Sequence, residues 1–226
     1  EIHMKKRLTR FLPFLLAFTI ALPSYSVFAE EENQTKEPQT NETQANEATA
    51  NDTLSLAAET AVLIDAASGE ILYDKDADKK MYPASITKLM TILLALENGK
   101  LTDEITFSHD AVYNIEPGSA HIAILEGETL TLEQVLRAII LRSANEASNG
   151  VAEYVDGSVE AFAKHMTERA KELGCTNTNF VNANGLFDEN HYTTAHDMAL
   201  IARELLKHEE YRSMMSETDY EIPPTN

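Results

Sequence analysis

The chain has 226 residues, of which 43% are hydrophobic, and this is enough for one domain with a buried core. It carries 18 basic and 37 acidic residues, a formal net charge of −19 at pH 7. Such a chain repels phosphates, so the charge excludes nucleic acid as a partner. The only cysteine, Cys175, rules out an internal disulfide. It follows Gly174 at an expected helix end, which favours a small buried residue over a catalytic thiolate.

The N-terminal 29 residues have the pattern of an export signal. A basic segment, Lys5 to Arg10, precedes an apolar stretch from Phe11 to Leu22. Val27-Phe28-Ala29 then fits the small-residue rule for a cleavage site. The apolar stretch is short for a membrane-spanning helix, although an uncleaved anchor stays an alternative. We assign residues 1–29 to a signal peptide, leave them out of the fold and expect an exported protein.

Residues 30–54 predict a disordered acidic linker. They consist mainly of Glu, Asn, Gln, Thr and Ala, with no aromatic residue. A segment of this composition buries too little apolar surface to offset the entropy of ordering. The folded domain is therefore expected over residues 55–226.

The domain begins with two strand patterns and continues with helices. Thr60–Asp65 and Glu70–Tyr73 flank a turn with Gly69, which predicts a β-hairpin. Residues 108–130 are expected to be mostly loops. Five helices are expected, over 85–96, 132–142, 145–156, 158–173 and 194–206, followed by a strand that starts at Tyr220.

The expected sheet is incomplete. A hairpin of two strands is marginal alone and needs further strands. The chain stops as a new strand starts, so we expect a domain that is cut short at its C-terminal end.

Ser85 and Lys88 form the first candidate site. They lie three residues apart at the expected start of a buried helix, so both side chains share one face. Serine attacks a carbonyl only when a base accepts its proton, and a neutral lysine is such a base. Burial and the positive end of a helix both favour the neutral amine. The alternative is a capping serine beside a solvated lysine.

Ser143-Ala144-Asn145 forms the second candidate site. It separates two expected helices, so it marks a tight corner. A hydroxyl there could pass a proton from Lys88 to a leaving amine, and the Asn145 amide could hold a substrate amide. The alternative is simple capping of the following helix.

In this order the two motifs resemble the signature of the penicillin-binding proteins and serine β-lactamases. The detail resembles the low-molecular-weight D-alanyl-D-alanine carboxypeptidases, peptidase family S11. The resemblance extends over about residues 58–226. The matching motifs are Pro83-Ala84-Ser85-Ile86-Thr87-Lys88, Ser143-Ala144-Asn145-Glu146-Ala147, Asn182-Ala183-Asn184-Gly185-Leu186 and His191-Tyr192-Thr193-Thr194-Ala195-His196-Asp197-Met198.

The resemblance implies a fold, an activity and site residues. The fold class is α+β, an α/β sandwich of the β-lactamase/transpeptidase type, with a mostly helical subdomain and an antiparallel sheet incomplete at the C-terminal end. Ser85 is implied to be the nucleophile that forms an acyl-enzyme, and Lys88 its base. Ser143 is implied to pass the proton to the departing D-alanine, and Asn145 to bind the substrate.

The resemblance also implies partners and a location. The substrates are peptidoglycan stem peptides that end in D-Ala-D-Ala, and β-lactam antibiotics are inhibitors. No cofactor is implied. The location is the extracytoplasmic face of the cell membrane or the cell wall. Peripheral membrane association is implied only through a C-terminal part that is not in this sequence.

The sequence departs from the family pattern at two points. Ala144 stands where the family usually has glycine. The Lys-Thr-Gly motif, which supplies part of the oxyanion hole, does not occur before Asn226. Loss of one oxyanion donor costs about 10²–10³ in rate. The activity of a chain that ends at Asn226 is therefore left open.

The motifs leave two alternatives to a carboxypeptidase. A serine β-lactamase of the same fold is disfavoured, because residues 165–195 hold no Glu-x-x-x-Asn arrangement for deacylation. A non-catalytic penicillin- or peptidoglycan-binding fragment is the other alternative. His121, His191 and His196 lack further ligands at suitable spacing, so no metal is expected.

Overall fold

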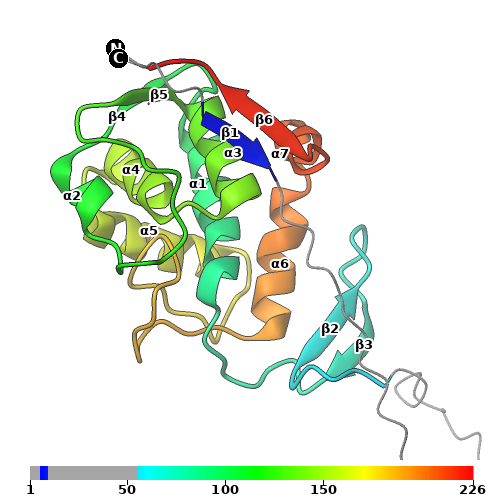
Figure 1. Cartoon of the computed structure of the whole chain (residues 1–226). Helices are drawn as coiled ribbons and strands as arrows, with labels where there is room; N and C mark the ends of the chain where they lie inside the picture. The colour runs from blue at the N-terminus through cyan, green and yellow to red at the C-terminus, as the bar shows by residue number, and fades with distance from the viewer. Residues whose placement is uncertain (1–5, 10–54, 226) are drawn as a thin grey trace, which may run out of the picture. The chain divides into compact units, whose positions relative to one another are not determined.

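The computed structural model describes residues 6–9 and 55–225, all within one compact unit. Its strands are β1 (Lys6–Thr9), β2 (Ala61–Ile64), β3 (Ile71–Lys75), β4 (Glu104–Thr106), β5 (Thr129–Thr131) and β6 (Asp219–Ile222). Its helices are the 3₁₀ turn η2 (Ala84–Thr87), α1 (Lys88–Asn98), α2 (His109–Tyr113), α3 (Leu132–Arg142), α4 (Asn145–Asp156), α5 (Val159–Glu172), α6 (Ala195–Leu205) and α7 (Glu209–Met215). Within the described residues the strands pair as three two-stranded antiparallel sheets at the margin of a helical body (Figure 1). The α+β class is confirmed.

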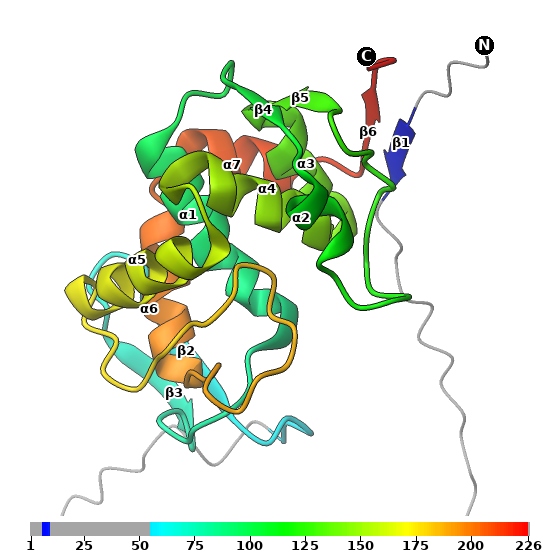
Figure 2. The same cartoon turned by 90° about the vertical axis from the view of Figure 1, so that its left-hand side faces the viewer.

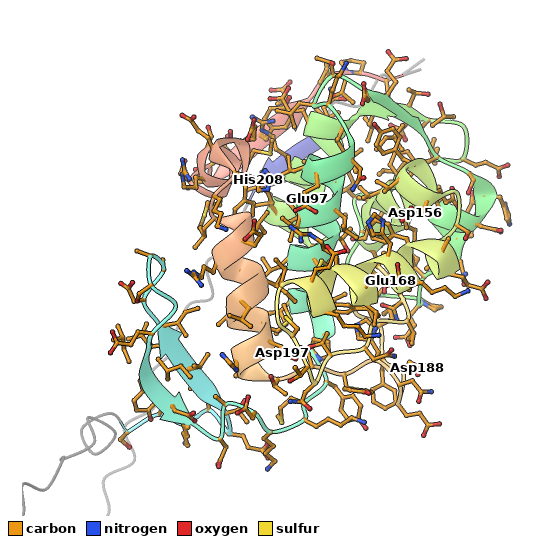
Figure 3. All side chains as sticks on the ribbon, turned by 180° about the vertical axis from the view of Figure 1, so that it is seen from behind. Glu97, Asp156, Glu168, Asp188, Asp197 and His208 are labelled. Atoms are coloured by element: carbon orange, nitrogen blue, oxygen red, sulfur yellow. The ribbon has the colours of Figure 1, made fainter. Side chains whose placement is uncertain are left out.

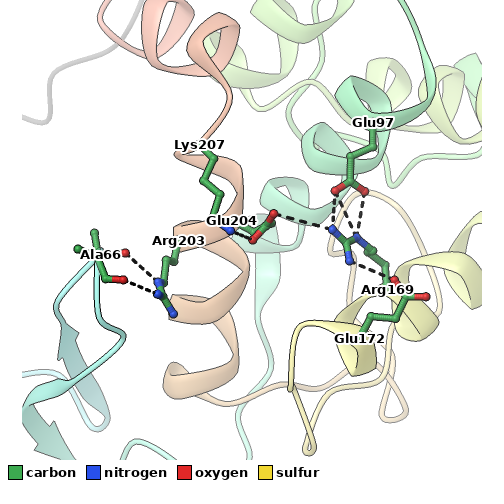
Figure 4. Close-up of polar contacts among 8 residues, drawn as sticks. Ala66, Glu97, Arg169, Glu172, Arg203, Glu204 and Lys207 are labelled. Carbon is green, nitrogen blue, oxygen red and sulfur yellow. Dashed lines mark hydrogen bonds and ion pairs between the residues drawn. The ribbon is translucent and has the colours of Figure 1, made fainter.

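The predicted N-terminal hairpin is confirmed as β2 and β3, with Ala61 opposite Lys75. Its turn is fixed by Asp65, whose Oδ1 accepts hydrogen bonds from the backbone amides of Ala67 and Ser68 at 3.1 and 2.6 Å. This is the Asx type of turn, in which the side chain replaces a backbone acceptor. Arg203 on α6 donates to the carbonyl oxygens of Ala66 and Ala67, both at 2.8 Å, and so fastens the turn to the helical body (Figure 4).

Helix α1 is the centre of the core. Its residues Met90, Leu93 and Leu94 have no exposed surface. It contacts α3, α4, α5 and α6, which surround it in both views (Figures 1 and 2). The prediction of a central buried helix is confirmed, but its start is corrected. The α-helix begins at Lys88, and Ser85 lies in the preceding 3₁₀ turn.

The corner between α3 and α4 is as the sequence predicts. Thr131 and Gln134 form a capping box at the start of α3, where the helix over 132–142 was expected to begin. The helix ends at Arg142, and Ser143 then takes the left-handed conformation with φ 55°. Helix α4 begins at Asn145, which places the second motif between two packed helices.

Two short helices, α2 and α7, and the strand β5 were not predicted. Residues 108–130 contain α2, capped by Ser108, whose side chain accepts from the Ala111 amide, and also β5. Helix α7 lies before β6. α2 has 5 residues and α7 has 7, too few for a helical period to show in the sequence.

An ion-pair network centred on Arg169 joins the helices α1, α5 and α6. Arg169 on α5 donates to both carboxylate oxygens of Glu97 at the end of α1, with its shortest contact at 2.7 Å (Figure 4). It also pairs with Glu172 at 3.1 Å and approaches Glu204 on α6 at 4.0 Å. A forked contact of this kind fixes geometry better than a single exposed pair.

Strand β1 corrects the exclusion of residues 1–29 from the fold. Lys6–Thr9 pairs antiparallel with β6, Lys6 opposite Ile222 (Figure 1). The physical reason is that the edge of β6 presents backbone donors and acceptors that a second strand satisfies. The signal-peptide assignment itself stays a prediction. Residues 1–5 and 10–54, which include the rest of that segment and the expected linker, lie outside the described residues. Within the described ranges, no helix combines the length and the apolar character that crossing a membrane requires.

Candidate active site

Ser85 lies at an exposed position on η2, immediately before α1. Pro83 precedes the turn, and Ala84 has a positive φ of 49°. Non-glycine residues rarely adopt this conformation, and it persists only where surrounding contacts enforce it. Because a 3₁₀ turn has three residues per turn, it places Ser85 and Lys88 directly above one another. The predicted side-by-side arrangement is confirmed, on a tighter turn than expected.

Lys88 is buried and makes three polar contacts. Its Nζ lies 3.3 Å from Ser85 Oγ, 2.8 Å from Asn145 Oδ1 and 2.6 Å from the backbone oxygen of Asn184. Burial lowers the pKa of Lys88 to about 8, and the Glu146 carboxylate opposes this shift. At pH 7 roughly one-tenth of such an amine is neutral. The structure thus brings together Ser85, Lys88 and Asn145.

Ser143 lies in the same pocket but is not hydrogen-bonded to the other three. The pocket has a volume of ≈ 230 Å³ and is lined by Ser85, Lys88 and Ser143. Apolar side chains of Ile139 and Tyr211 form other parts of its wall. The hydroxyl of Ser143 is buried and has no hydrogen-bond partner among the described residues. Ser143 thus lines the pocket with a hydroxyl whose hydrogen-bonding capacity is unused among the described residues.

Asn184 was not predicted as a site residue. The sequence shows an Asn-Gly turn there, whereas the contact with Lys88 is made by the backbone oxygen, which has no sequence signal. The Asn184 side chain donates to Asn149 Oδ1 on α4 at 3.1 Å and accepts from the Leu186 amide at 2.9 Å. These two bonds hold its carbonyl group against Lys88.

Gly185 allows this loop to approach η2. Its φ is +87°, and a Cβ at this position would collide with the carbonyl oxygen of Ala84. Thr91 on α1 adds a hydrogen bond to the carbonyl oxygen of Ala183 at 2.6 Å. The loop therefore follows the backbone of the Ser85 turn closely.

His191 fixes the other side of the loop. Its Nδ1 accepts from the Val181 amide at 3.1 Å, so the proton is on Nε2, which donates to Thr87 Oγ1 at 2.7 Å. Burial lowers the pKa of His191 to about 4, so the ring is neutral at pH 7. The histidine supports Thr87, which lies between Ser85 and Lys88.

The other histidines and the cysteine singled out in the sequence make no contact with Ser85 or Lys88 that the structure records. His196 pairs with Asp78 at 3.3 Å, and His121 is exposed. Burial raises the pKa of the Cys175 thiol to about 12, which agrees with the prediction of a small buried residue. Asp197 lies at the start of α6 (Figure 3). It accepts from the Asn177 amide and from Thr178 Oγ1 and so anchors the segment before the loop. Among the described residues, no three His, Cys, Asp or Glu side chains are grouped to hold a metal ion.

The helical body and the Ser-x-x-Lys and Ser-x-Asn corners define the class of penicillin-binding, transpeptidase-like proteins. The model of the D-alanyl-D-alanine carboxypeptidase family, peptidase S11, matches residues 43–222, and the chain belongs to that family.

Named relatives agree with this assignment. The chain is 43% identical over 161 residues to the D-alanyl-D-alanine carboxypeptidase DacF of Bacillus subtilis, covering 69% of this chain and 41% of DacF. It is 33% identical over 216 residues to DacA of Haemophilus influenzae, covering 92% of this chain and 51% of DacA. The solved structure of penicillin binding protein 5 from Haemophilus influenzae matches with a TM-score of 0.69 and 32% identity, covering 76% of this chain and 53% of that one. This chain therefore spans about half the length of these relatives or less.

Proposed function

We propose that this chain carries the catalytic serine and lysine of a D-Ala-D-Ala carboxypeptidase that trims peptidoglycan stem peptides. The observation that carries the proposal is the set of contacts around Lys88 Nζ. Two of its three partners, Asn145 Oδ1 and the Asn184 carbonyl oxygen, are hydrogen-bond acceptors only. A neutral amine donates its two hydrogens to them, so its lone pair faces the third partner, Ser85 Oγ. This is the geometry of a base beside its nucleophile.

The proposed reaction has two steps. Lys88 removes the proton from Ser85 Oγ as this oxygen attacks the carbonyl carbon between the two D-alanines. The C–N bond breaks, the proton passes through Ser143 Oγ to the leaving amine, and D-alanine departs. Water then attacks the ester on Ser85 and releases the shortened peptide. A β-lactam ring would acylate the same oxygen, since its strained amide opens by the same attack.

Ser143 and Asn145 have distinct proposed roles. Ser143 lines the pocket that contains Ser85 and Lys88, and its hydroxyl has no hydrogen-bond partner among the described residues, which supports its role as the proton relay. Asn145 first holds Lys88 through Oδ1, and its amide group lies at the corner where a substrate amide would arrive. We also propose that the mature protein works outside the cytoplasmic membrane, because its substrate lies there and residues 1–29 have the pattern of an export signal.

Labelling with a fluorescent penicillin tests the proposal. The chain is incubated with the reagent, and the adduct is located by mass spectrometry of its peptides. We expect a stable adduct on Ser85, none on Ser85→Ala, and slowed formation with Lys88→Ala. Circular dichroism of each variant confirms that it is folded. A folded chain that acquires no Ser85 adduct would refute the proposal, and rapid release of hydrolysed penicillin would favour a β-lactamase instead.

A further inference from the structure

A second pocket lies beside the α3–α4 corner. We call it the Glu146 pocket. It has a volume of ≈ 360 Å³ and lies between the end of α2, the loop of residues 114–125 and the first turn of α4. Its walls are largely apolar and include Val112, Ile115, Ile124 and Leu125. None of the residues of the proposed reaction lines it.

Glu146 is a buried polar residue of this pocket, and one of its carboxylate oxygens lacks a hydrogen-bond partner among the described residues. The residue is 1% exposed, and one carboxylate oxygen, Oε1, accepts from the Ile122 amide at 2.7 Å. The other oxygen, Oε2, is buried and has no hydrogen-bond partner among the described residues. An unpaired buried acceptor destabilises the fold, and it does so more when it is charged. A donor in the pocket would remove this destabilisation.

The contacts of Glu146 also indicate which donor fits. A guanidinium group binds a carboxylate best through two parallel hydrogen bonds to both oxygens. Here Oε1 is already occupied by Ile122, so only one acceptor remains. An ammonium group is a compact point charge that needs only one such acceptor. The apolar walls suit a chain of methylene groups behind it.

We propose that the Glu146 pocket binds a primary ammonium group on an aliphatic stem, as in a lysine-type side chain, with Oε2 of Glu146 as its acceptor. Glu116 at the pocket wall adds a second negative charge, whereas His121 adds a cation only when protonated. The site is separate from the proposed reaction, and binding to it is measurable without catalysis.

A bound ammonium group would also change the protonation equilibrium of Lys88. Asn145, which precedes Glu146, accepts a hydrogen bond from Lys88 at its side-chain Oδ1, and its backbone N–H donates to the Ala120 carbonyl oxygen in the pocket loop. The Glu146 carboxylate is the group whose charge opposes the lowered pKa of Lys88. A cation at Oε2 offsets that charge and so favours the neutral form of Lys88. Occupancy of the pocket and the protonation of Lys88 are therefore linked.

The test is a nuclear magnetic resonance titration of the ¹⁵N-labelled chain at pH 8. The probes are n-butylammonium, the neutral 1-butanol and n-butylguanidinium, and the reporter is the Ile122 amide. We expect saturable shifts with n-butylammonium and about tenfold weaker binding of 1-butanol, the loss expected for a hydrogen bond to a charged group. The guanidinium probe should also bind more weakly. Equal binding of 1-butanol would overturn the proposal and show a merely apolar crevice.

Three variants locate the binding. Glu146→Gln should lose the preference for n-butylammonium over 1-butanol. Glu160→Gln is the matched control, since Glu160 is also an acidic residue in the first turn of a helix but is exposed. Leu125→Trp enlarges an exposed side chain of the pocket wall while leaving the Glu146 carboxylate in place, and it should abolish binding, which keeps the test decisive if Glu146→Gln does not fold. Unchanged binding of n-butylammonium by folded Leu125→Trp would refute the site.

Discussion

Lys88 Nζ donates a hydrogen bond to the backbone carbonyl oxygen of Asn184 at 2.6 Å across a sequence separation of 96 residues. A backbone oxygen cannot be protonated near neutral pH, so this contact uses one hydrogen of the amine whether Lys88 is charged or neutral. The contact with Asn145 Oδ1 uses a second hydrogen. The last position on the nitrogen, a hydrogen or the lone pair, then faces Ser85 Oγ. The loop of Asn184 is therefore as important to the proposed base as Lys88 itself.

Lys88→Arg should abolish the function of the base while keeping a positive charge. A guanidinium group stays protonated and cannot accept the proton of Ser85. General base catalysis contributes about 10²–10⁴ in rate, and we expect acylation by penicillin to slow by that factor. The measurement is the rate constant for adduct formation. Lys80→Arg, an exchange on the exposed loop before η2, is the control and should acylate at the normal rate. A normal rate with Lys88→Arg would exclude Lys88 as the base.

The acylation rate should rise with pH and level off above about pH 8. The active form of Lys88 is the neutral amine, and burial lowers its pKa to about 8, so deprotonation on going from pH 6 to pH 9 produces the base. Glu146→Gln removes the carboxylate that opposes this shift, so its rate profile should move to lower pH. The measurement is adduct formation from pH 6 to pH 10 for both proteins. A profile of Glu146→Gln that coincides with that of the original chain, or moves to higher pH, would contradict this electrostatic link.

Gly185→Ala should weaken both the fold and the site. The new Cβ would collide with the Ala84 carbonyl oxygen and would also occupy a backbone conformation with φ +87°. We expect a loss of more than about 2 kcal/mol in the free energy of unfolding and slower acylation, because Asn184 is displaced from Lys88. Gly157→Ala is the matched control, since its φ is +77° but no atom lies within 4 Å of the new Cβ. It should cost only about 1 kcal/mol, the penalty of the left-handed backbone. Equal losses in urea denaturation would show that the close approach to Ala84 is unimportant.

Sequence patterns with a local cause were predicted correctly. The predicted turn between the strands β2 and β3 is closed by contacts within a few residues, and the predicted helix over 132–142 begins at a cap that is made within one turn. The spacing of Ser85 and Lys88 places them together because any helical turn brings residues three apart onto one face.

Features that depend on distant contacts were missed. Asn184 acts through a backbone oxygen, which is the same atom in every residue. Glu146 stands in the first turn of α4, where an acidic residue normally faces solvent, yet the loop of residues 114–125 covers it. The buried environment of His191 depends on Thr87, 104 residues earlier. No local pattern encodes such packing.

Acid should destabilise the chain through His191. The pKa of this ring is lowered to about 4 by burial, against about 6.5 in the unfolded chain. Between these values the unfolded state binds more protons, so the stabilising contribution is fully present above pH 6.5 and is lost as the pH falls towards 4. From pH 7.5 to pH 5.0 we expect a loss of about 2 kcal/mol in the free energy of unfolding from this group.

His191→Gln tests this assignment. Glutamine keeps one donor for Thr87 and one acceptor for the Val181 amide but does not titrate, so the variant should be less stable at pH 7.5 yet lose about 2 kcal/mol less on acidification. His121→Gln, at an exposed imidazole, should retain the full acid sensitivity of the original chain. The measurement is urea denaturation of the three proteins at pH 7.5 and 5.0. If His191→Gln is as acid-sensitive as the original chain, the buried proton-binding site lies elsewhere, and His191 does not hold the Ser85 turn as a neutral ring.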